Sequence, residues 1–597
     1  MSDPSAALCF KDFSFQYRSQ SGPTLFDINL TVGRGEKILI LGPSGSGKST
    51  LAHCINGLIP HAFKGTIGGS YTIMGEDGQG LDIFALSKKV GTLLQDTDGQ
   101  FVGLSAGEDI AFAAENDCVS VEEMHRRVPE AARLVHIEDH LAKPPQDLSG
   151  GQKQRVSLAG LLMNDVELLL FDEPLANLDP ATGKEAIELI DRLHRETGKT
   201  VIIVEHRLED VLHRPVDRII VIEKGRIMAD LPPAELLASD LLGKAGIREP
   251  FYVGALRYAG VELKPDMGLE SVETLRFDPR ILKDWDAGLK EDAPDKPAPV
   301  LLEVRGLQYR YPDVADPSPG AKQVLDGVSF SLAKGECISM VGRNGAGKST
   351  LAKLIAGFIR PDAGQIFFDG KDLAAYSIKE RSEHIGYVMQ NPNQMISFPL
   401  IFDETALALR NRGINENETR DRVFEALGVC GLYQFRNWPV NALSFGQKKR
   451  LTIASVLVMG PSLIILDEPT AGQDYRHYSE IMEFLRKLNR EQGLSFLLIT
   501  HDMHLMLEYT RRALVLSEGK LLTRDGPGGG DTPAAVLTDD FLVEAASLKR
   551  TSLYDLAIKA GMTDPRAFVR RFIDHEQSRR EAQLDAGLRA SAQGATP

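Results

Sequence analysis

The sequence contains few cysteines and no long apolar run. Its five cysteines are scattered, odd in number and form no Cys-x-x-Cys pair: Cys9, Cys54, Cys118, Cys337 and Cys430. This pattern argues against a disulfide framework and a zinc site, and favours reduced thiols of a cytosolic protein. Because no run of about 18 apolar residues is present, we expect no membrane-spanning segment. The start, Met1-Ser2-Asp3-Pro4, lacks the basic and apolar regions of a secretion signal.

An excess of basic residues is also missing. Lys and Arg number 68 against 83 Asp and Glu, which gives a net charge of −15. Nucleic-acid-binding proteins normally carry a basic domain or stripe, so we expect no nucleic-acid partner. The 597 residues, 43% of them hydrophobic, are sufficient for several packed domains.

One stretch occurs twice in the chain. An apolar strand, a glycine-rich loop and a helix start follow one another at residues 39–50 and again at residues 339–350. Glycines let successive backbone N–H groups point at phosphate oxygens, and the helix N-terminus adds its positive dipole end. In such a loop the lysine reaches the β and γ phosphates and the serine offers a hydroxyl to Mg²⁺. The predicted nucleotide-binding residues are Gly42, Pro43, Ser44, Gly45, Ser46, Gly47, Lys48, Ser49 and Thr50, and Gly342, Arg343, Asn344, Gly345, Ala346, Gly347, Lys348, Ser349 and Thr350.

Further residues repeat at a fixed distance. Four pairs lie 295 positions apart, whereas the loop lysines lie 300 apart: Gln95 and Gln390, Leu148 and Leu443, Glu173 and Glu468, and His206 and His501. A glycine-rich turn before an ordinary helix is the alternative for one isolated match, but it does not explain this shared series. A repeat of this length with one phosphate-binding loop per copy predicts two tandem domains.

Two acidic pairs follow buried-strand runs, Asp172-Glu173 and Asp467-Glu468. Adjacent strand residues point to opposite faces, so we expect different roles for the two acids of each pair. We predict that Asp172 and Asp467 hold Mg²⁺, together with Ser49 and Ser349, and that Glu173 and Glu468 polarise the attacking water.

Gln95, Gln390, His206 and His501 complete the predicted site. A glutamine amide can bind Mg²⁺ or position water, although a lone loop glutamine usually does neither; its repetition favours a role as a metal ligand. A lone histidine after a strand is usually structural, but at the carboxyl edge of a sheet it can contact the charge that develops on a γ-phosphate. We therefore predict that both histidines are catalytic.

Two further sets of residues are predicted to contact the nucleotide. A turn of small residues with a serine N-cap exposes backbone N–H groups to an anion. A tyrosine can stack on adenine; the alternative is that it is an ordinary core or surface residue. A merely capped helix does not explain why the turn recurs. The residues are Ser149, Gly150, Gly151 and Gln152, then Ser444, Phe445, Gly446 and Gln447, with Tyr17 and Tyr311 as the aromatic pair.

With these elements the chain resembles the ATP-binding cassette (ABC) ATPases, over residues 5–240 and 301–525. The resemblance implies an α/β fold of two tandem P-loop NTPase domains, each with a RecA-like core, a helical subdomain and an antiparallel β subdomain. It also implies a D-loop at Asp179 and Asp474. We expect domains at 5–245 and 301–525, a linker at 246–300 and a small C-terminal helical tail at 526–597, disordered after Gly587. We expect the tail to be a packing appendage; partner docking and regulation are the alternatives.

Finer features are similar to the ATPase subunit of energy-coupling factor transporters, which import vitamins and transition-metal ions. They are residues 95–100, 204–206 and 470–474. The resemblance implies ATP and Mg²⁺ as cofactors, a transmembrane coupling subunit and a solute-binding membrane subunit as partners, and a peripheral location on the cytoplasmic face of the cell (inner) membrane.

The resemblance further implies that the two halves pair within the chain, so that one copy serves each transporter. Each ATP would lie between the Walker A loop of one half and the signature of the other, and two hydrolytic sites are predicted. Two positions depart from the pattern. Phe445 predicts an altered but active signature, and Met395, where the first half has Gln100, predicts that the halves grip the membrane partner differently.

Two other functions remain as alternatives. Soluble twin-cassette ATPases that act on ribosomes join their halves by a long basic helix, whereas residues 290–297 here are acidic and broken by prolines. Fused ATPases of monosaccharide importers usually have one degenerate site, whereas both glutamates and both histidines are present here. Cobalt, nickel, biotin, riboflavin and thiamine-related compounds all stay open as solutes; the fused arrangement favours a vitamin.

Overall fold

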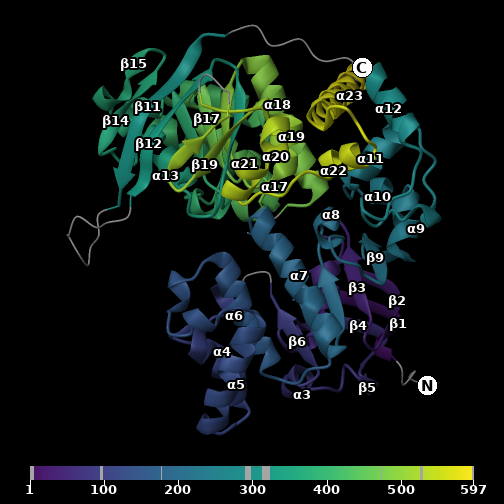
Figure 1. Ribbon diagram of the computed structural model, residues 1–597. Helices are drawn as coiled ribbons and strands as arrows, with labels where there is room; N and C mark the ends of the chain where they lie inside the picture. Colours follow the sequence, from purple (N-terminus) through teal and green to yellow (C-terminus); the bar gives the residue numbers. More distant parts are fainter. Residues whose placement is uncertain are drawn as a thin grey trace. The chain divides into compact units, whose positions relative to one another are not determined.

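The computed structural model describes residues 6–94, 98–176, 178–289, 298–311, 323–471, 473–524 and 529–593. The chain divides into two compact units, one of Met1–Leu282 with Gly472–Arg476 and one of Lys283–Ala471 with His477–Pro597. Figure 1 shows the two units in colours that follow the sequence.

The first unit is built around a mixed sheet with the strand order β10-β9-β3-β8-β7-β6. Its strands are β3 (Lys37–Leu41), β6 (Val90–Leu93), β7 (Leu168–Asp172), β8 (Thr200–Val204), β9 (Arg218–Glu223) and β10 (Arg226–Leu231). All neighbours pair in parallel except β10, which is antiparallel to β9. Every residue of β3, β7 and β8 is buried, as expected of parallel strands covered on both faces.

A second, antiparallel sheet in this unit has the order β2-β1-β4-β5. Its strands are β1 (Ala6–Tyr17), β2 (Leu25–Gly33), β4 (Gly65–Ile73) and β5 (Glu76–Asp77). Phe10 stacks on Tyr71 with ring centroids 5.3 Å apart, and Phe13 meets both rings edge-on. Side chains of both sheets join in one hydrophobic core, which fixes the antiparallel sheet against the strand that leads into the first glycine-rich loop.

Helices complete the first unit, and α4, α5 and α6 pack together as a helical subdomain (Figure 1). The helices are α1 (Lys48–Ile55), α2 (Leu58–His61), α3 (Ile83–Ser87), α4 (Ala106–Asn116), α5 (Val121–Leu134), α6 (Gly150–Leu162), α7 (Pro180–Thr197), α8 (Leu208–Val211), α9 (Pro233–Ala238), α10 (Leu241–Lys244), α11 (Phe251–Tyr258) and α12 (Pro279–Gly288), which continues into the second unit.

The second unit repeats the architecture, with sheets in the orders β20-β19-β13-β18-β17-β16 and β12-β11-β14-β15. The strands are β11 (Val300–Arg310), β12 (Gln323–Ala333), β13 (Cys337–Val341), β14 (Ala363–Phe368), β15 (Lys371–Asp372), β16 (Ile385–Val388), β17 (Leu463–Asp467), β18 (Ser495–Ile499), β19 (Arg512–Ser517) and β20 (Lys520–Leu522). The predicted α/β fold of two tandem domains, each with a core sheet, a helical subdomain and an antiparallel sheet, is confirmed.

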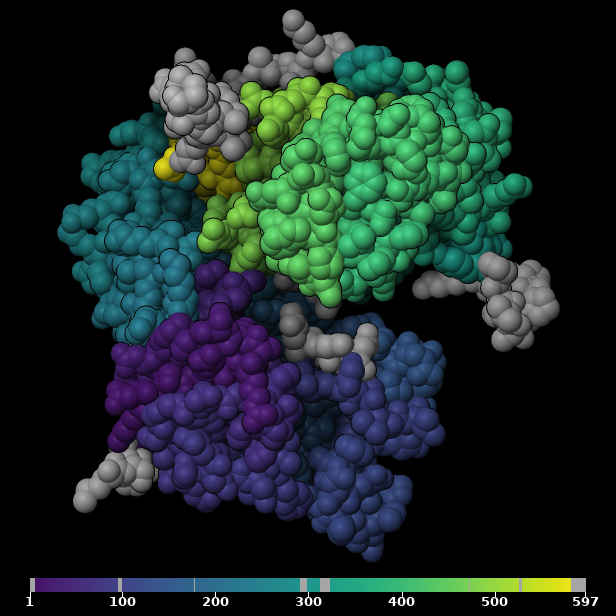
Figure 2. All heavy atoms as spheres, turned by 180° about the vertical axis from the view of Figure 1, so that it is seen from behind, coloured from purple at the N-terminus to yellow at the C-terminus, as the bar shows by residue number. Residues whose placement is uncertain are grey.

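The helices of the second unit include a subdomain of α15, α16 and α17 that matches α4, α5 and α6. Figure 2 shows this part of the chain as a continuous green lobe. The helices are α13 (Lys348–Ala356), α14 (Ile378–Arg381), α15 (Ile401–Arg410), α16 (Glu416–Val429), α17 (Phe445–Leu457), α18 (Tyr475–Gln492), α19 (Met503–Tyr509), α20 (Pro533–Thr538), α21 (Asp540–Ala545), α22 (Ser552–Lys559) and α23 (Pro565–Gln593).

Residues 246–300 hold more structure than a linker. They include α11 and α12, and the buried Tyr252 donates its hydroxyl hydrogen to the carbonyl oxygen of Leu269 at 2.8 Å. Helices α11 and α12 span only eight and ten residues, which is too short for a long helical period to reveal them in the sequence.

The C-terminal tail is helical, as the sequence predicts, and its disorder after Gly587 stays a prediction. Helix α23 runs to Gln593, past the expected onset of disorder at Gly587. Phe568 of this helix is buried and contacts Trp285 of α12 edge-on, while Arg571 donates two hydrogen bonds to Asp286. The first part of the tail is therefore packed through both apolar and charged contacts.

Among the described residues, no helix combines the length and the apolar character that crossing a membrane requires.

A buried ion pair joins the first core sheet to α7. Lys37 Nζ lies 2.5 Å from Asp191 Oδ1, and both side chains are about 95% buried (exposed fractions 5% and 6%). Removing one partner of such a pair leaves an uncompensated buried charge and costs about 3–5 kcal/mol. We therefore expect Asp191→Asn to lower the free energy of unfolding by about that amount, measured by denaturant titration.

The matched control is Asp165→Asn. Asp165 pairs with Lys199 at 2.9 Å, but its carboxylate is fully exposed, and such pairs contribute no more than about 1 kcal/mol. Equal effects of the two substitutions would contradict a stabilising role for the Lys37–Asp191 pair.

Candidate functional site

The two glycine-rich loops each connect a core strand to a helix, as predicted. Lys48 Nζ donates hydrogen bonds to the carbonyl oxygens of Gly42 at 2.8 Å and Pro43 at 3.1 Å. Lys348 Nζ does the same to Gly342 at 2.7 Å and Arg343 at 3.0 Å. The lysine at the start of each loop helix therefore makes the same two contacts in both units.

Glycine is required at the helix start of the first loop. Gly47 has φ of +108°, in the left-handed region, and a Cβ there would lie 2.7 Å from Leu25. The hydroxyl of Ser46 is buried and has no hydrogen-bond partner among the described residues. An anion inside the loop fits this arrangement, because it would accept the hydrogen bond that Ser46 can donate.

The predicted aromatic residues lie beside the loop helices. The hydroxyl groups of Tyr17 and Thr50 are 3.1 Å apart, and those of Tyr311 and Thr350 are 3.2 Å apart. The two tyrosines thus occupy the same place in the two units, although Tyr311 is 45% exposed and Tyr17 is half-buried. Stacking on a base stays a prediction.

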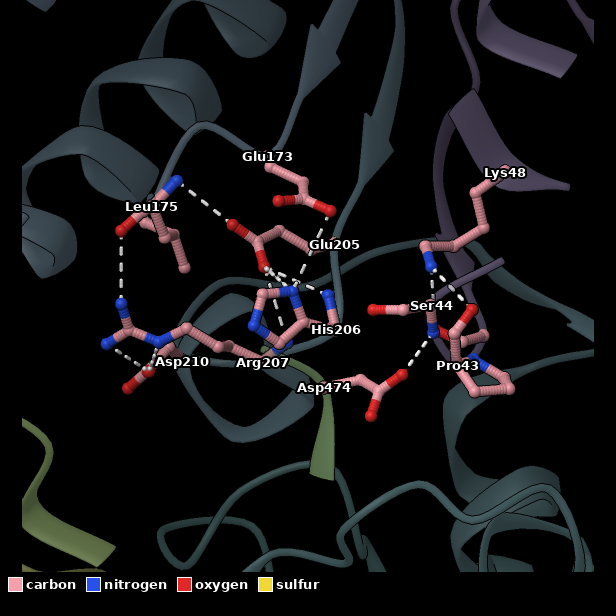
Figure 3. A network of polar contacts seen from close by, with 11 residues as sticks. Pro43, Ser44, Lys48, Glu173, Leu175, Glu205, His206, Arg207, Asp210 and Asp474 are labelled. Atoms are coloured by element: carbon pink, nitrogen blue, oxygen red, sulfur yellow. Dashed lines mark hydrogen bonds and ion pairs between the residues drawn. The ribbon is translucent and has the colours of Figure 1, made fainter. Parts of the chain in front are cut away.

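The remaining first-unit residues meet at the carboxyl edge of the core sheet. Parallel pairing in the order β3-β8-β7 brings the glycine-rich loop, Glu205 and His206, and Asp172 and Glu173 to the same edge. Figure 3 shows Lys48, Glu173, Glu205 and His206 in this region. The strand order therefore brings the loop next to Asp172 and Glu173, although more than 100 residues of chain separate them.

Neither of the two glutamates predicted to be catalytic continues its strand. β7 ends at Asp172 and β17 at Asp467, and Glu173 and Glu468 have φ of +50° and +46°. The left-handed region costs a non-glycine residue roughly 1–2 kcal/mol. The prediction that the two acids point to opposite faces by strand alternation is therefore incomplete, because the backbone turns at the glutamate.

In the first acidic pair, Asp172 is buried and the side chain of Glu173 is 16% exposed. Asp172 Oδ1 is buried and has no hydrogen-bond partner among the described residues. Burial raises the pKa of Asp172 to about 6, and burial together with nearby Glu205 raises the pKa of Glu173 to about 7. A cation beside Asp172 would satisfy the open oxygen and favour the ionised carboxylate.

In the second unit, two of the predicted metal ligands, Ser349 and Asp467, are hydrogen-bonded to each other. Burial raises the pKa of Asp467, while hydrogen bonds from Ser349 and from the Tyr387 hydroxyl, at 3.1 Å, act in the opposite direction. Oxygen donors of this kind suit Mg²⁺. Ser349 and Asp467 therefore fit a shared cation, whereas Gln390 is exposed on the neighbouring loop. Gln95 lies outside the described residues.

The two histidines differ in their contacts. His501 Nδ1 lies 2.8 Å from Glu468 Oε1. His206 Nδ1 lies 4.0 Å from Glu173 Oε1 and 3.6 Å from Glu205 Oε2. Within the described residues, His501 is thus hydrogen-bonded to the glutamate that follows its neighbouring strand, whereas His206 lies beyond hydrogen-bond distance of Glu173.

Both signature turns form the same helix cap. The N–H of Gln152 donates to Ser149 Oγ while the N–H of Ser149 donates to the Gln152 side chain, and Ser444 and Gln447 repeat this reciprocal pair. Phe445, where the first unit has Gly150, is 44% exposed at the start of α17. The substitution therefore leaves the cap intact, and the backbone N–H groups stay at the helix N-terminus.

One difference inside the signature helices was not anticipated. Gln154 donates to the carbonyl oxygen of Pro174 at 2.7 Å, directly after Glu173. Lys449 occupies the same position in the second unit and donates to the carbonyl oxygens of Met389 and Gln390 at 2.9 and 2.8 Å. The replacement of Gln154 by Lys449 can be read from the sequence at the 295-residue spacing. Their hydrogen-bond partners cannot, because these depend on which loop each side chain reaches.

Comparison with known proteins gives two family matches. A family described as "ABC transporter" matches residues 25–176 and 325–471, and one described as "ATP-binding cassette cobalt transporter" matches residues 239–309. The second match covers the segment that contains α11 and α12.

Close relatives match along almost the whole chain. A protein from Clostridium perfringens named as an ABC transporter ATP-binding protein is 54% identical, over 96% of this chain and 99% of its own. One from Vibrio parahaemolyticus with the same kind of name is 53% identical, over 96% and 97%. The solved structure of cbiO1 from Clostridium perfringens, described as part of the ABC transporter complex cbiONQ, is 33% identical and covers 41% of this chain and 94% of its own, with a TM-score of 0.36.

The buried Lys449 predicts a pH-dependent stability. Its side chain is 1% exposed, and burial lowers its pKa from 10.5 to about 8 despite nearby Asp467 and Glu468. Between these two values the unfolded chain binds more protons than the folded one, so stability rises with pH. Relative to Lys449→Met, we expect the parent to gain about 1–2 kcal/mol from pH 8 to pH 9.5 in denaturant unfolding.

The neighbouring Lys448→Met is the control. Lys448 is bonded to Asn393 on the surface, so its removal should leave the pH dependence of the parent in place. Parallel stability curves for parent and Lys449→Met would contradict the lowered pKa.

Proposed function

The chain belongs to the ABC transporter ATP-binding proteins, and we propose that it powers uptake through an importer of the energy-coupling factor type. Proteins of this family are ATPases, so ATP binding and ATP hydrolysis coupled to transmembrane transport describe its activity. The importer type, the solute, the metal ion and the partners are the proposed parts.

The match of residues 239–309 to the cobalt transporter family carries the proposal. Residues 239–282 of this segment belong to the first unit, and Tyr252, Leu256 and Leu269 are buried there. It lies between the two stretches that match the general family, residues 25–176 and 325–471. A transition-metal ion, cobalt first, is therefore the solute that we propose, with a vitamin as the second candidate.

The geometry supports a separate role for each set of residues in ATP hydrolysis. Lys48 and Lys348 would hold the β and γ phosphates, with the loop N–H groups and the signature serines Ser149 and Ser444 as further anion donors. Glu173 and Glu468 would accept a proton from, or polarise, the attacking water. His206 and His501 would stabilise the charge on the transferred phosphoryl group.

Mg²⁺ fits the acidic pairs of both units. Ser49 and Asp172 in the first unit, and Ser349 and Asp467 in the second, would hold it together with the Q-loop glutamines Gln95 and Gln390. When bound, Mg²⁺ would neutralise part of the negative charge of the nucleotide's phosphates. The open, buried Asp172 Oδ1 is the feature that supports this assignment in the first unit.

The proposal includes membrane partners. We propose a transmembrane coupling subunit and a solute-binding membrane subunit, with the ATPase peripheral on the cytoplasmic face of the cell membrane. One copy of the chain would serve each transporter, because both ATPase domains are already present. With a net charge of −15, the chain offers no general attraction for nucleic acid.

Both sites are expected to turn over. Glu173→Gln and Glu468→Gln should each lower the ATPase rate at least about twofold, and the double variant should lower it at least about 100-fold, because an amide cannot take up the proton. The measurement is phosphate release by the purified chain, with ATP binding as the control that should stay unchanged. A double variant that keeps half the parent rate would contradict the assignment of the two glutamates.

Membrane partners are tested by affinity capture from detergent-solubilised native membranes in ATP and Mg²⁺. The Glu173→Gln, Glu468→Gln double variant should retain ATP and hold its partners longer than the parent does. We expect a small multi-spanning protein and a second, solute-specific membrane protein. Capture of ribosomes without membrane proteins would overturn the importer proposal.

Uptake by intact cells identifies the solute. Cells that carry the parent chain should accumulate Co²⁺ at least about tenfold faster than cells that carry the double variant, because the variant retains ATP without turning it over. Equal Co²⁺ uptake with a difference in biotin, riboflavin or thiamine uptake would move the assignment to a vitamin.

A further inference from the structure

The residue before each switch histidine differs between the two units. Glu205 precedes His206, and Thr500 precedes His501, at the same 295-residue spacing. Both side chains are completely buried, with exposed fractions of 0%. A buried carboxylate is costly unless its oxygens accept hydrogen bonds, so the contacts of Glu205 show what holds it there.

Glu205 accepts hydrogen bonds from three backbone N–H groups on two turns. The N–H of Leu175 donates to Oε1 at 2.9 Å. The N–H groups of His206 and Arg207 donate to Oε2 at 2.9 and 3.3 Å. The carboxylate thus connects the turn that follows Glu173 to the turn that carries His206 (Figure 3).

Arg207 strengthens the same connection. Its Nη1 donates to the carbonyl oxygen of Leu175 at 3.1 Å, and its Nε donates to Asp210 at 2.8 Å. Leu175 is therefore held at both its N–H and its carbonyl by the two residues that flank His206. Pro174, one residue earlier, accepts the hydrogen bond of Gln154 from the signature helix.

The main chain anchors this group to the core sheet. The N–H of Glu205 donates to the carbonyl oxygen of Ile40 at 3.1 Å, and the N–H of Glu173 donates to that of Val204 at 2.9 Å. The second unit has the same two backbone bonds, from Thr500 to Met340 and from Glu468 to Ile499. The side chains, not the strand ends, therefore distinguish the units.

The second unit uses its side chains differently. The Thr500 hydroxyl accepts a hydrogen bond from the N–H of Asp502 at 2.9 Å, and Asp502 caps α19. His501 contacts Glu468 directly at 2.8 Å. There the histidine is positioned by the catalytic glutamate itself.

We propose that Glu205 is a positioning residue for ATP hydrolysis in the first unit, where it fixes His206 and the turn after Glu173 as one group. Its carboxylate takes the place of the direct histidine–glutamate contact of the second unit. Turnover at the first site then depends on Glu205, and turnover at the second site does not. The inference rests on the proposed roles of Glu173 and His206.

The test isolates one site at a time in the purified full-length chain. Glu468→Gln leaves the first site active, and Glu173→Gln leaves the second. Glu205→Gln is added to each. The amide keeps the shape of the side chain, but its nitrogen cannot accept a hydrogen bond, so either the Leu175 link or the His206 link is lost.

In the Glu468→Gln background we expect Glu205→Gln to lower kcat at least about tenfold, because a small displacement of a catalytic group can lower the rate up to about 100-fold. The KM for ATP should stay within about twofold of that of Glu468→Gln alone. In the Glu173→Gln background the same substitution should leave kcat unchanged. A kcat within twofold of Glu468→Gln alone would overturn the proposal, and so would an equal loss in both backgrounds.

The melting temperature and the equilibrium binding of ATP serve as controls that each variant is folded. If Glu205→Gln lowers either, Glu205→Asp provides the second variant. Its carboxylate keeps the charge but is one methylene shorter, so it should not span both turns, and kcat should again fall while KM stays. A parental kcat in Glu205→Asp would count against the proposal. Because the assay needs no membrane partner, its failure is distinguishable from failure of the importer proposal.

Discussion

The parallel pairing of β3, β8 and β7 is the constraint on which the first site depends. The carboxyl ends of these strands carry the glycine-rich loop, the Glu205-His206 pair and the Asp172-Glu173 pair. No local signal places the glycine-rich loop beside the other two segments, since more than 100 residues of chain separate it from Asp172. Their strands are nonetheless forced side by side, because every residue of the three is buried and must pack on both faces.

The two units share this strand order and differ in how side chains hold the residues predicted to be catalytic. In the first unit, Gln154 and Glu205 both reach the turn after Glu173. In the second, Lys449 reaches the loop of Gln390 instead, and His501 contacts Glu468. The signature helix is thus tied to the Walker B turn in one unit and to the Q-loop in the other, so equal motif residues need not give equal sites.

Much of this arrangement could be predicted from the sequence. The loops at residues 42–50 and 342–350 and the helix caps at Ser149 and Ser444 follow local rules, because each requires a residue type at one position of one element. The partners of Gln154, Lys449 and Glu205 could not be predicted, since a side chain's partner depends on which turn lies within reach. Helices α11 and α12 could not be predicted for a different reason: each is too short, at eight and ten residues, to give a long helical period.

The left-handed backbone of Glu173 explains why a neighbouring residue can control it. With φ of +50° the residue is held against its own preference, by its N–H bond to Val204 and by the bond from Ala176 to its carbonyl oxygen. A strained residue persists only where its surroundings fix it. The next residues, Pro174 and Leu175, are fixed by Gln154 and Glu205. The main chain at and after Glu173 is therefore held by β8 and by the turn that carries His206, beyond the end of β7.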